Sequence, residues 1–284
     1  MKKTSIVFLI ISVILILTGI VIKNKSVALA EKENIKIYRQ ELTENGDLIE
    51  TVEFSPENTN KINIKLKDTD VNVIGNAEKN YIEIINFNTL EYSAYSNNRS
   101  FNIENDIISA LSGRAESGNI SFDGIRDFVR LDKHNTERKI NVYISASAQI
   151  KIFDIDIENG NVSFNNINQI CDYNVKINQG NITLSGTPTV SLTDFYIKKG
   201  NISLDDAFIA NAKLKTENGN VNFSTLSNII YDYEIEAETG IIKINDETYN
   251  GKYSIENDEV NGIINAHVGV GNVTITTIAP SFEA

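Results

Sequence analysis

The chain has 284 residues, 41% of them hydrophobic, and a formal net charge of -12. Outside residues 1–25, 22 basic residues stand against 38 acidic ones, an acidic excess that disfavours nucleic-acid binding. Only three prolines occur, and β-branched residues are abundant, so the composition is that of an ordered, strand-forming chain. The single cysteine, Cys171, excludes an intramolecular disulfide and a thiolate metal cluster, and we expect it to pack as a small apolar residue.

An uncharged apolar run opens the chain, from Ser5 to Ile22, with two lysines close to it on each side. As a helix rising ~1.5 Å per residue, the run matches the hydrocarbon thickness of a bilayer. A cleaved signal peptide ending at Ala30 is the alternative, because Ala28 and Ala30 fit the small-residue rule for cleavage. The length of the run favours a retained anchor, with the short N-terminal tail inside and the rest exported. We therefore predict a single-pass cell-membrane protein whose bulk is extracytoplasmic.

Three segments follow in chain order. Residues 1–25 are the predicted anchor, residues 26–60 a juxtamembrane linker with leading strands, and residues 61–284 a repeat domain. Residues 35–87 have the pattern of strands, with clear alternation at Ile62–Leu66 and Val71–Val73 and a turn expected at Gly75 and Asn76 before Tyr81. Residues 90–135 are less regular, and we interpret them as an insertion or an elaborated rung that includes a helical turn near Ile107.

A short phrase then recurs: Gly-Asn, an apolar residue, a small polar residue and another apolar residue. The glycines are Gly160, Gly180, Gly200, Gly219 and Gly271, and Gly240 keeps the frame without the Asn. Successive steps from Gly160 to Gly240 are 20, 20, 19 and 21 residues, whereas the step to Gly271 is 31. A period in this range indicates a solenoid, in which each repeat buries its apolar face against its neighbours. The long last step suggests an excursion before the final rung.

The pattern predicts an all-β fold, a parallel and right-handed β-helix with rungs of about 20 residues. Each rung is expected to be a strand, a tight corner and a second strand, with the glycine supplying a positive φ at the corner. The predicted corner residues are Gly160, Asn161, Gly180, Asn181, Gly200, Asn201, Gly219, Asn220, Gly240, Gly271 and Asn272. Their asparagines should form an amide ladder, each side chain donating to the next.

The same stacking predicts two internal apolar columns. One contains Val162, Ile182, Ile202, Val221 and Ile242, and the other Phe164, Leu184, Leu204, Phe223 and Ile244. Equivalent residues of neighbouring rungs would then lie ~4.8 Å apart along the axis.

No motif predicts a reaction. His134 and His267 lie far apart in the sequence and form no recognisable metal site. Asp205 and Asp206 are adjacent in a strand, so they point to opposite faces and do not form a catalytic dyad. The loop from Asn257 to Gly262 has oxygen side chains but no glutamate at the twelfth position of a calcium loop. We therefore predict no catalytic residue, no cofactor and no metal, and a protein that is not an enzyme.

The order of these strands and corners resembles a bacterial family of β-strand-repeat "putative adhesin" proteins, catalogued as a domain of unknown function and related to head-type adhesin domains. The segments that carry the resemblance are Ile64–Val73, Lys139–Ile144 and the corners at Glu158–Val162, Asn178–Ile182 and Glu217–Val221. It covers roughly residues 60–280. The resemblance implies a parallel β-helix on a membrane anchor in the envelope of a Gram-positive-type cell, with no established catalytic residues. Some relatives are encoded with envelope-stress systems.

Three functions remain open at this stage. The favoured one is a non-catalytic, membrane-anchored adhesin, envelope scaffold or signalling accessory, whose partners are the membrane and an envelope protein or wall polymer. The alternative is a membrane-tethered β-helix that faces the cytoplasm and forms polymers through its open rung ends. A polysaccharide-acting enzyme is the less favoured third, because no arginine follows Arg138 to assist chemistry in the regular array.

Overall fold

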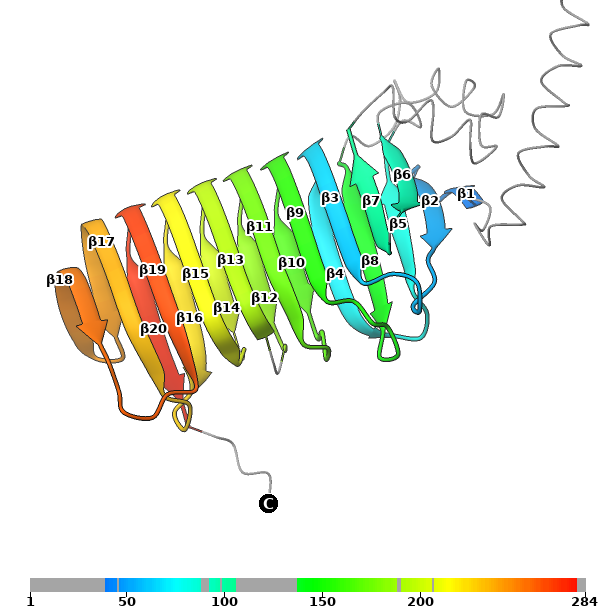
Figure 1. The fold of residues 1–284 in the computed structure, drawn as a ribbon. Coiled ribbons are helices and arrows are strands. Elements are labelled where there is room, and N and C mark those ends of the chain that lie inside the picture. Colours follow the sequence, from blue (N-terminus) through cyan, green and yellow to red (C-terminus); the bar gives the residue numbers. More distant parts are fainter. Residues whose placement is uncertain are drawn as a thin grey trace, which may run out of the picture.

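The computed structural model describes residues 39–44, 46–87, 92–97, 99–105, 137–187, 190–205 and 207–279. Within these residues the chain is all-β, and its 20 strands form one continuous hydrogen-bonded sheet that folds back on itself (Figure 1). The predicted anchor at residues 5–22, the helical turn near Ile107 and most of the predicted insertion lie outside the described residues. Among the described ones, no helix is long and apolar enough to cross a membrane.

The strands of the N-terminal half are β1 Arg39–Leu42, β2 Leu48–Glu53, β3 Lys61–Asp68, β4 Asp70–Ala77, β5 Tyr81–Ile85, β6 Ser93–Asn97, β7 Ser100–Glu104, β8 Lys139–Ser145, β9 Ile152–Asn159 and β10 Val162–Asn165. Those of the C-terminal half are β11 Cys171–Gln179, β12 Ile182–Ser185, β13 Val190–Lys199, β14 Ile202–Asp205, β15 Ile209–Asn218, β16 Val221–Leu226, β17 Tyr231–Ile244, β18 Glu247–Ile255, β19 Gly262–Val270 and β20 Val273–Ile278.

The repeating unit is a long strand, a corner and a short strand. The pairs β3/β4, β9/β10, β11/β12, β13/β14, β15/β16 and β19/β20 are such rungs, and β17 forms a further one by running through its own corner. Long strands pair in parallel with long strands, and short strands with short strands. The rungs therefore stand side by side as a rod with a long-strand sheet and a short-strand sheet (Figure 1). The solenoid expected from the repeat is present, and its right-handedness stays a prediction.

The last two rungs are not in chain order, an arrangement that was not predicted from the sequence. β19 pairs in parallel with both β15 and β17, and β20 pairs with both β16 and β17. The final repeat of the sequence thus lies between the two repeats that precede it. The excursion indicated by the 31-residue step is present as β18, which folds antiparallel onto β17, but the rung that follows it is not the last one in space. The predicted contact of Val221 with Ile242 is wrong for the same reason, because Val273 lies between them.

Both ends of the rod are closed by antiparallel strands. At the N-terminal end, β7 and β8 extend the two sheets in parallel beside β3 and β4. β6 then pairs antiparallel with β7, and β5, β2 and β1 follow antiparallel beyond β8. At the other end, Tyr249 and Tyr253 of β18 pack against the core. Caps of this kind shield the apolar ends of a solenoid.

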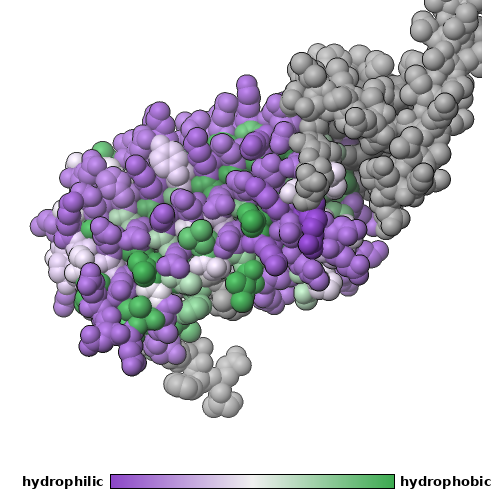
Figure 2. All heavy atoms as spheres, in the orientation of Figure 1, coloured by the Kyte–Doolittle hydropathy of each residue, from purple (hydrophilic) through white to green (hydrophobic). Residues whose placement is uncertain are grey.

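The interior is a mainly apolar column, because side chains alternate between the two sides of each strand. The two predicted internal columns are buried throughout, apart from Ile244, which is partly buried at the capped end. Each such side chain stabilises the rod by about 1.5–3 kcal/mol relative to exposure. Outside, Figure 2 shows hydrophilic residues over most of the face in view, with hydrophobic ones in separate patches.

One predicted turn is wrong. Gly75 and Asn76, expected to separate two strands, lie inside β4, and the chain turns at residues 78–80 instead. Asn76 has a φ of 57°, which accounts for its turn-like sequence. A Cβ on Gly75 would lie 2.0 Å from the backbone oxygen of Asn166 in the neighbouring rung, so this glycine permits close packing of two rungs.

Candidate functional site

The corner glycines stack directly on one another. Gly160, Gly180, Gly200, Gly219, Gly240 and Gly271 have φ between 137° and 156°. A Cβ on Gly180 would lie 1.7 Å from the carbonyl oxygen of Gly160, and one on Gly200 would lie 1.6 Å from that of Gly180. These positions therefore require glycine for two reasons, the backbone angle and the closeness of the next rung.

The corner asparagines form a continuous ladder with a fixed direction. The side-chain amide of Asn181 donates to the oxygen of Asn161 at 3.0 Å, Asn201 donates to Asn181 at 3.3 Å, and Asn220 donates to Asn201 at 3.0 Å. Each oxygen also accepts the backbone N–H of the next asparagine, at 2.8–3.1 Å. The ladder continues through Asn272, which accepts from the backbone of Ile241 at the last corner. The side-chain amides of Asn181, Asn201 and Asn220 consequently donate in the same direction along the rod.

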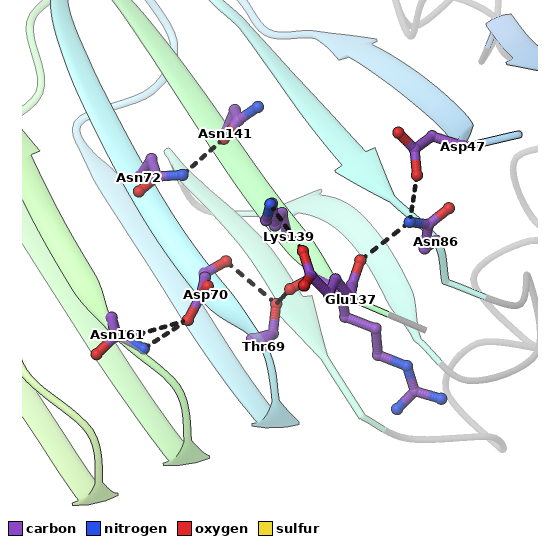
Figure 3. A network of polar contacts seen from close by, with 10 residues as sticks. Asp47, Thr69, Asp70, Asn72, Asn86, Glu137, Lys139, Asn141 and Asn161 are labelled. Carbon is purple, nitrogen blue, oxygen red and sulfur yellow. Dashed lines mark hydrogen bonds and ion pairs between the residues drawn. The ribbon is translucent and has the colours of Figure 1, made fainter. Parts of the chain in front are cut away.

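A carboxylate closes the acceptor end of this ladder (Figure 3). Oδ1 of Asp70 accepts both the backbone N–H and the side-chain amide of Asn161, at 2.8 and 3.1 Å. The corner of this first rung is Thr69 and Asp70 instead of Gly-Asn, and the Thr69 hydroxyl donates to the backbone oxygen of Arg138. This corner was not predicted from the sequence because it lacks the glycine. The sequence signal that could have identified this corner is the motif Asp70-Val-Asn-Val, in which polar and apolar residues alternate as they do after the later corner glycines.

The outward side of the short-strand sheet carries three rows of small polar side chains, which together we name the amide–hydroxyl face. The corner row is Asp70, Asn161, Asn181, Asn201, Asn220 and Asn272; the middle row is Asn141, Asn72, Ser163, Thr183, Ser203, Asn222 and Thr274; the outer row is Asn165, Ser185, Asp205, Ser224 and Thr276. All are partly or fully exposed. Because the strands are in register, each row runs straight along the rod with one side chain per ~4.8 Å.

Hydrogen bonds orient the side chains of this face. The Ser185 hydroxyl donates to Asn165, whose amide donates to Ser163, and the Ser163 hydroxyl donates to Asn72 at 2.8 Å. Asn72 then donates to Asn141 at 3.0 Å, and Asn141 donates to Glu83 at 3.0 Å (Figure 3 shows Asn72 and Asn141). This second series of hydrogen bonds also ends on a carboxylate, and its donors also point toward the N-terminal end of the rod.

Two tyrosines continue the outer row at that end. Tyr81 and Tyr143 are cross-strand neighbours with stacked rings, 4.3 Å between centroids, and Ile74 follows Tyr143 in the row. The Tyr143 hydroxyl donates to Glu83 at 3.1 Å. Burial first, and then the negative charge of Glu83, raise the pKa of Tyr143 to about 12, so its hydroxyl stays a donor at neutral pH. Neither tyrosine stood out in the sequence, because the two strands that carry them lie far apart in the chain.

The outward side of the long-strand sheet has different chemistry, because it is densely charged. Its charged side chains include Lys65, Lys67, Asp154, Asp156, Glu158, Lys176, Asp194, Lys198, Lys213, Lys215, Glu217, Glu234, Glu236 and Glu238. The ammonium group of Lys61 on β3 pairs with the carboxylate of Asp154 on the neighbouring strand β9 at 2.6 Å. In contrast, the six short strands from β4 to β20 place only Asp70 and Asp205 as charges on the amide–hydroxyl face. The nearest cations along its rows, Lys139 and Lys243, belong to the flanking strands β8 and β17.

The residues considered for chemistry are dispersed. Cys171 is buried and its thiol donates to the backbone oxygen of Ile150, and burial raises its pKa to about 12, which makes it a poor nucleophile. His267 faces outward between Glu236 and Glu238, at 3.4 and 3.2 Å. His134 and Asp206 lie outside the described residues. Across the described residues, no three His, Cys, Asp or Glu side chains gather as a metal site.

The loop before β19 serves a structural role. Asn257 donates its side-chain amide to the backbone oxygen of Tyr231 and its backbone N–H to Asp232, both at 2.8 Å. Asn261 accepts the backbone N–H of Ile230 at 2.8 Å. These bonds fix the chain as it returns from β18 to enter between two earlier rungs.

Three solved structures resemble this fold. A "putative cell adhesion protein" from Clostridium sporogenes is 15% identical with a TM-score of 0.48, covering 84% of this chain and all of that one. A "putative adhesin" from Bacteroides fragilis is 12% identical with a TM-score of 0.41, covering 81% of this chain and 97% of that one. Another from Parabacteroides distasonis is 6% identical with a TM-score of 0.30, covering 83% and 98%. At such low identity the likeness concerns the fold alone.

No curated protein matches the chain. A protein-family model described as Toastrack DUF4097 matches residues 18–269, which is most of the chain. The resemblance drawn from the repeat segments is thereby confirmed, and the chain belongs to the Toastrack DUF4097 family.

Proposed function

We propose that this protein is a non-catalytic binding module of the adhesin or envelope-scaffold type, held to the cell membrane by residues 5–22 with its rod outside the cytoplasm. The observation that carries the proposal is the difference between the two sides of the rod. One side is charged and the other is an ordered array of amides and hydroxyls whose orientations are fixed by hydrogen bonds. Repeat rods commonly use such extended faces for binding.

The chemistry of the described residues supports a role without catalysis. A general acid or base needs a partner within hydrogen-bonding reach and a pKa matched to its task. Cys171 lies in the core with a raised pKa, and His267 lies between the carboxylates of Glu236 and Glu238 on the outward side of the rod. The half-buried carboxylates Asp70 and Glu83 each terminate a series of hydrogen bonds, so their role is to orient the face.

Protease treatment of intact cells tests the location. Cells that express the full chain are exposed to a protease that cannot cross the membrane, and the fate of the rod is followed by immunoblot. We expect loss of the rod from intact cells and its recovery in the membrane fraction without treatment. Protection until lysis would contradict the proposal and favour the cytoplasm-facing, polymer-forming alternative.

A matched pair of variants tests the anchor. Ile14→Arg places a charge at the centre of the apolar run, which disfavours insertion by about 3 kcal/mol, whereas Ile14→Leu keeps the run apolar. We expect the first variant to leave the membrane fraction and the second to remain there. Release of both, with a new N-terminus after Ala30, would instead indicate a cleaved signal peptide.

A further inference from the structure

We propose that the amide–hydroxyl face binds a neutral, β-1,4-linked glycan chain that lies along the axis of the rod. The inference deepens the proposed function by naming the class of ligand, and it rests on that function only in requiring a non-catalytic binding module.

The charges of the face decide against a charged polymer. Between β4 and β20 the face has two carboxylates and no cation, although the opposite side of the same rungs has many of both signs. A polyphosphate or a polyuronate would place anions against Asp70 and Asp205, and the cation beside Asp70, Lys139 of the flanking strand β8, is already paired with Glu137. A polymer of hydroxyl groups brings no charge that must lose its water.

The composition of the face also decides against a protein partner. Stable protein interfaces have an apolar centre in which aromatic residues are enriched. The middle of this face, around Thr183 and Ser203, is composed of hydroxyls and amides in the corner and middle rows, and of Ser185 and the carboxylate of Asp205 in the outer row. The apolar groups on this side of the rod lie toward its ends, with Ile74, Tyr81 and Tyr143 at one end and the exposed Leu226, Ile241 and Ile278 at the other.

The hydrogen-bonding capacity of the face matches sugar hydroxyls, which both donate and accept. Each laddered asparagine uses one of its two amide hydrogens within the ladder and keeps the other. Ser163 and Ser185 donate within the face and retain acceptor lone pairs. Because these side chains are already oriented, binding would cost little additional side-chain entropy.

The repeat of the face suits a linear chain of rings. Rows of the face repeat every ~4.8 Å, which is close to the advance per ring in an extended β-1,4-linked glycan. A chain along the middle row would meet a new hydroxyl or amide at nearly every ring, from Asn72 to Thr274. At the N-terminal end, Tyr81, Tyr143 and Ile74 supply an apolar surface for the C–H face of a sugar ring. Many weak contacts of this kind add up through multivalency.

The test is co-sedimentation of the detergent-solubilised full chain with insoluble chitin and cellulose, and with dextran sulfate beads as the polyanion. The face variant combines Thr183→Lys and Asn222→Lys, which place two long cations in the middle row. The matched control combines Asn174→Lys and Asn265→Lys, the same change in charge on the long-strand side. Circular dichroism and the unfolding midpoint verify that both variants are folded.

We expect the parent chain and the control to sediment with chitin or cellulose and not with dextran sulfate, and the face variant to bind at least about tenfold more weakly. Sedimentation with neither neutral polymer, preferential binding to the polyanion, or equal losses in the face variant and the control would each overturn the inference. A face variant that fails to fold is replaced by Thr183→Val with Asn222→Val, for which a loss of binding is again required. None of these results depends on the location of the rod, so a failure here is distinguishable from a failure of the protease experiment.

Discussion

The side-chain oxygen of Asn161 accepts two hydrogen bonds from Asn181, one from its backbone N–H at 3.1 Å and one from its side-chain amide at 3.0 Å. The same two-bond link recurs from Asn181 to Asn201 and from Asn201 to Asn220. Each asparagine therefore bonds to the rung on either side of it. In a solenoid, where stability is approximately a sum over rungs and their interfaces, such a link acts at every interface along the rod.

Removal of one ladder residue should weaken two interfaces at once. In Asn181→Ala the Asn161 oxygen loses its side-chain donor, and the backbone N–H and amide of Asn201 lose their acceptor. Because the ladder is exposed and water replaces part of these bonds, we expect a loss of about 1–2 kcal/mol in the free energy of unfolding, measured by urea titration with circular dichroism. Asn178→Ala, an exposed position three residues earlier, should change it by less than about 0.5 kcal/mol. Equal effects of the two variants would show that the ladder adds nothing.

Two glycines with positive φ should respond very differently to the same substitution. In Gly180→Ala the new Cβ would lie 1.7 Å from the Gly160 oxygen at a φ of 150°, so steric overlap adds to backbone strain. We expect a loss of about 4 kcal/mol, or failure to fold. Gly251 of β18 has a φ of 74°, and a Cβ added there would have no atom within 4 Å, so Gly251→Ala should cost only about 1 kcal/mol of backbone strain. The comparison is of unfolding midpoints, and a larger loss for Gly251→Ala would contradict the stacking of the corners.

The buried thiol should report opening of the rod. Burial raises the pKa of Cys171 from 9.0 to about 12, so the neutral thiol predominates in the folded state at any ordinary pH. Since the folded pKa lies above the unfolded one, the contribution of the neutral thiol to stability is complete below pH 9 and is lost as the pH rises toward 12. We expect a thiol reagent at pH 8 to react with Cys171 only at the rate at which β11 opens.

The control for this labelling is an exposed thiol on the same strand. Asn178→Cys in a Cys171→Ala background should react at once, without denaturant. Immediate reaction of Cys171 itself in the folded chain would contradict its place in the core.

The corners and columns could be predicted from sequence because each rung repeats the same environment. A glycine is required wherever one corner packs against the corner of the next rung, and apolar residues alternate with polar ones on either side of it. The spacing of about 20 residues therefore identifies the corner glycines and the apolar columns together. Thr69 and Asp70 escaped prediction because that corner has no glycine, although Asp70 performs the acceptor role of an asparagine. The amide–hydroxyl face was not foreseen because serine, threonine and asparagine at alternate positions are typical of any solvated strand. Only the parallel register shows that these residues align along the rod.

The order of the last rungs escaped prediction for a different reason. The corner at Gly219 offers the same backbone groups to any neighbour with a Gly-Asn phrase, and both Gly240 and Gly271 provide a glycine corner. The residue after each glycine distinguishes them, because Asn272 donates its backbone N–H to Asn220 and its side-chain oxygen also accepts the backbone N–H of Ile241. Gly240 is followed by Ile241, which can accept no bond in the ladder and therefore suits a terminal position.

Disulfide trapping tests this order directly. The register places Lys215 of β15 beside His267 of β19, and His267 beside Glu236 of β17. In a Cys171→Ala background, Lys215→Cys with His267→Cys should form a disulfide on mild oxidation, because adjacent strands lie ~4.8 Å apart. Lys215→Cys with Glu236→Cys should not, since two strand spacings, about 10 Å, exceed the reach of a disulfide. Peptide mapping by mass spectrometry identifies the bond. If only the second pair crosslinked, the rungs would follow chain order, and β19 and β20 would have to lie outside β17 at the end of the rod.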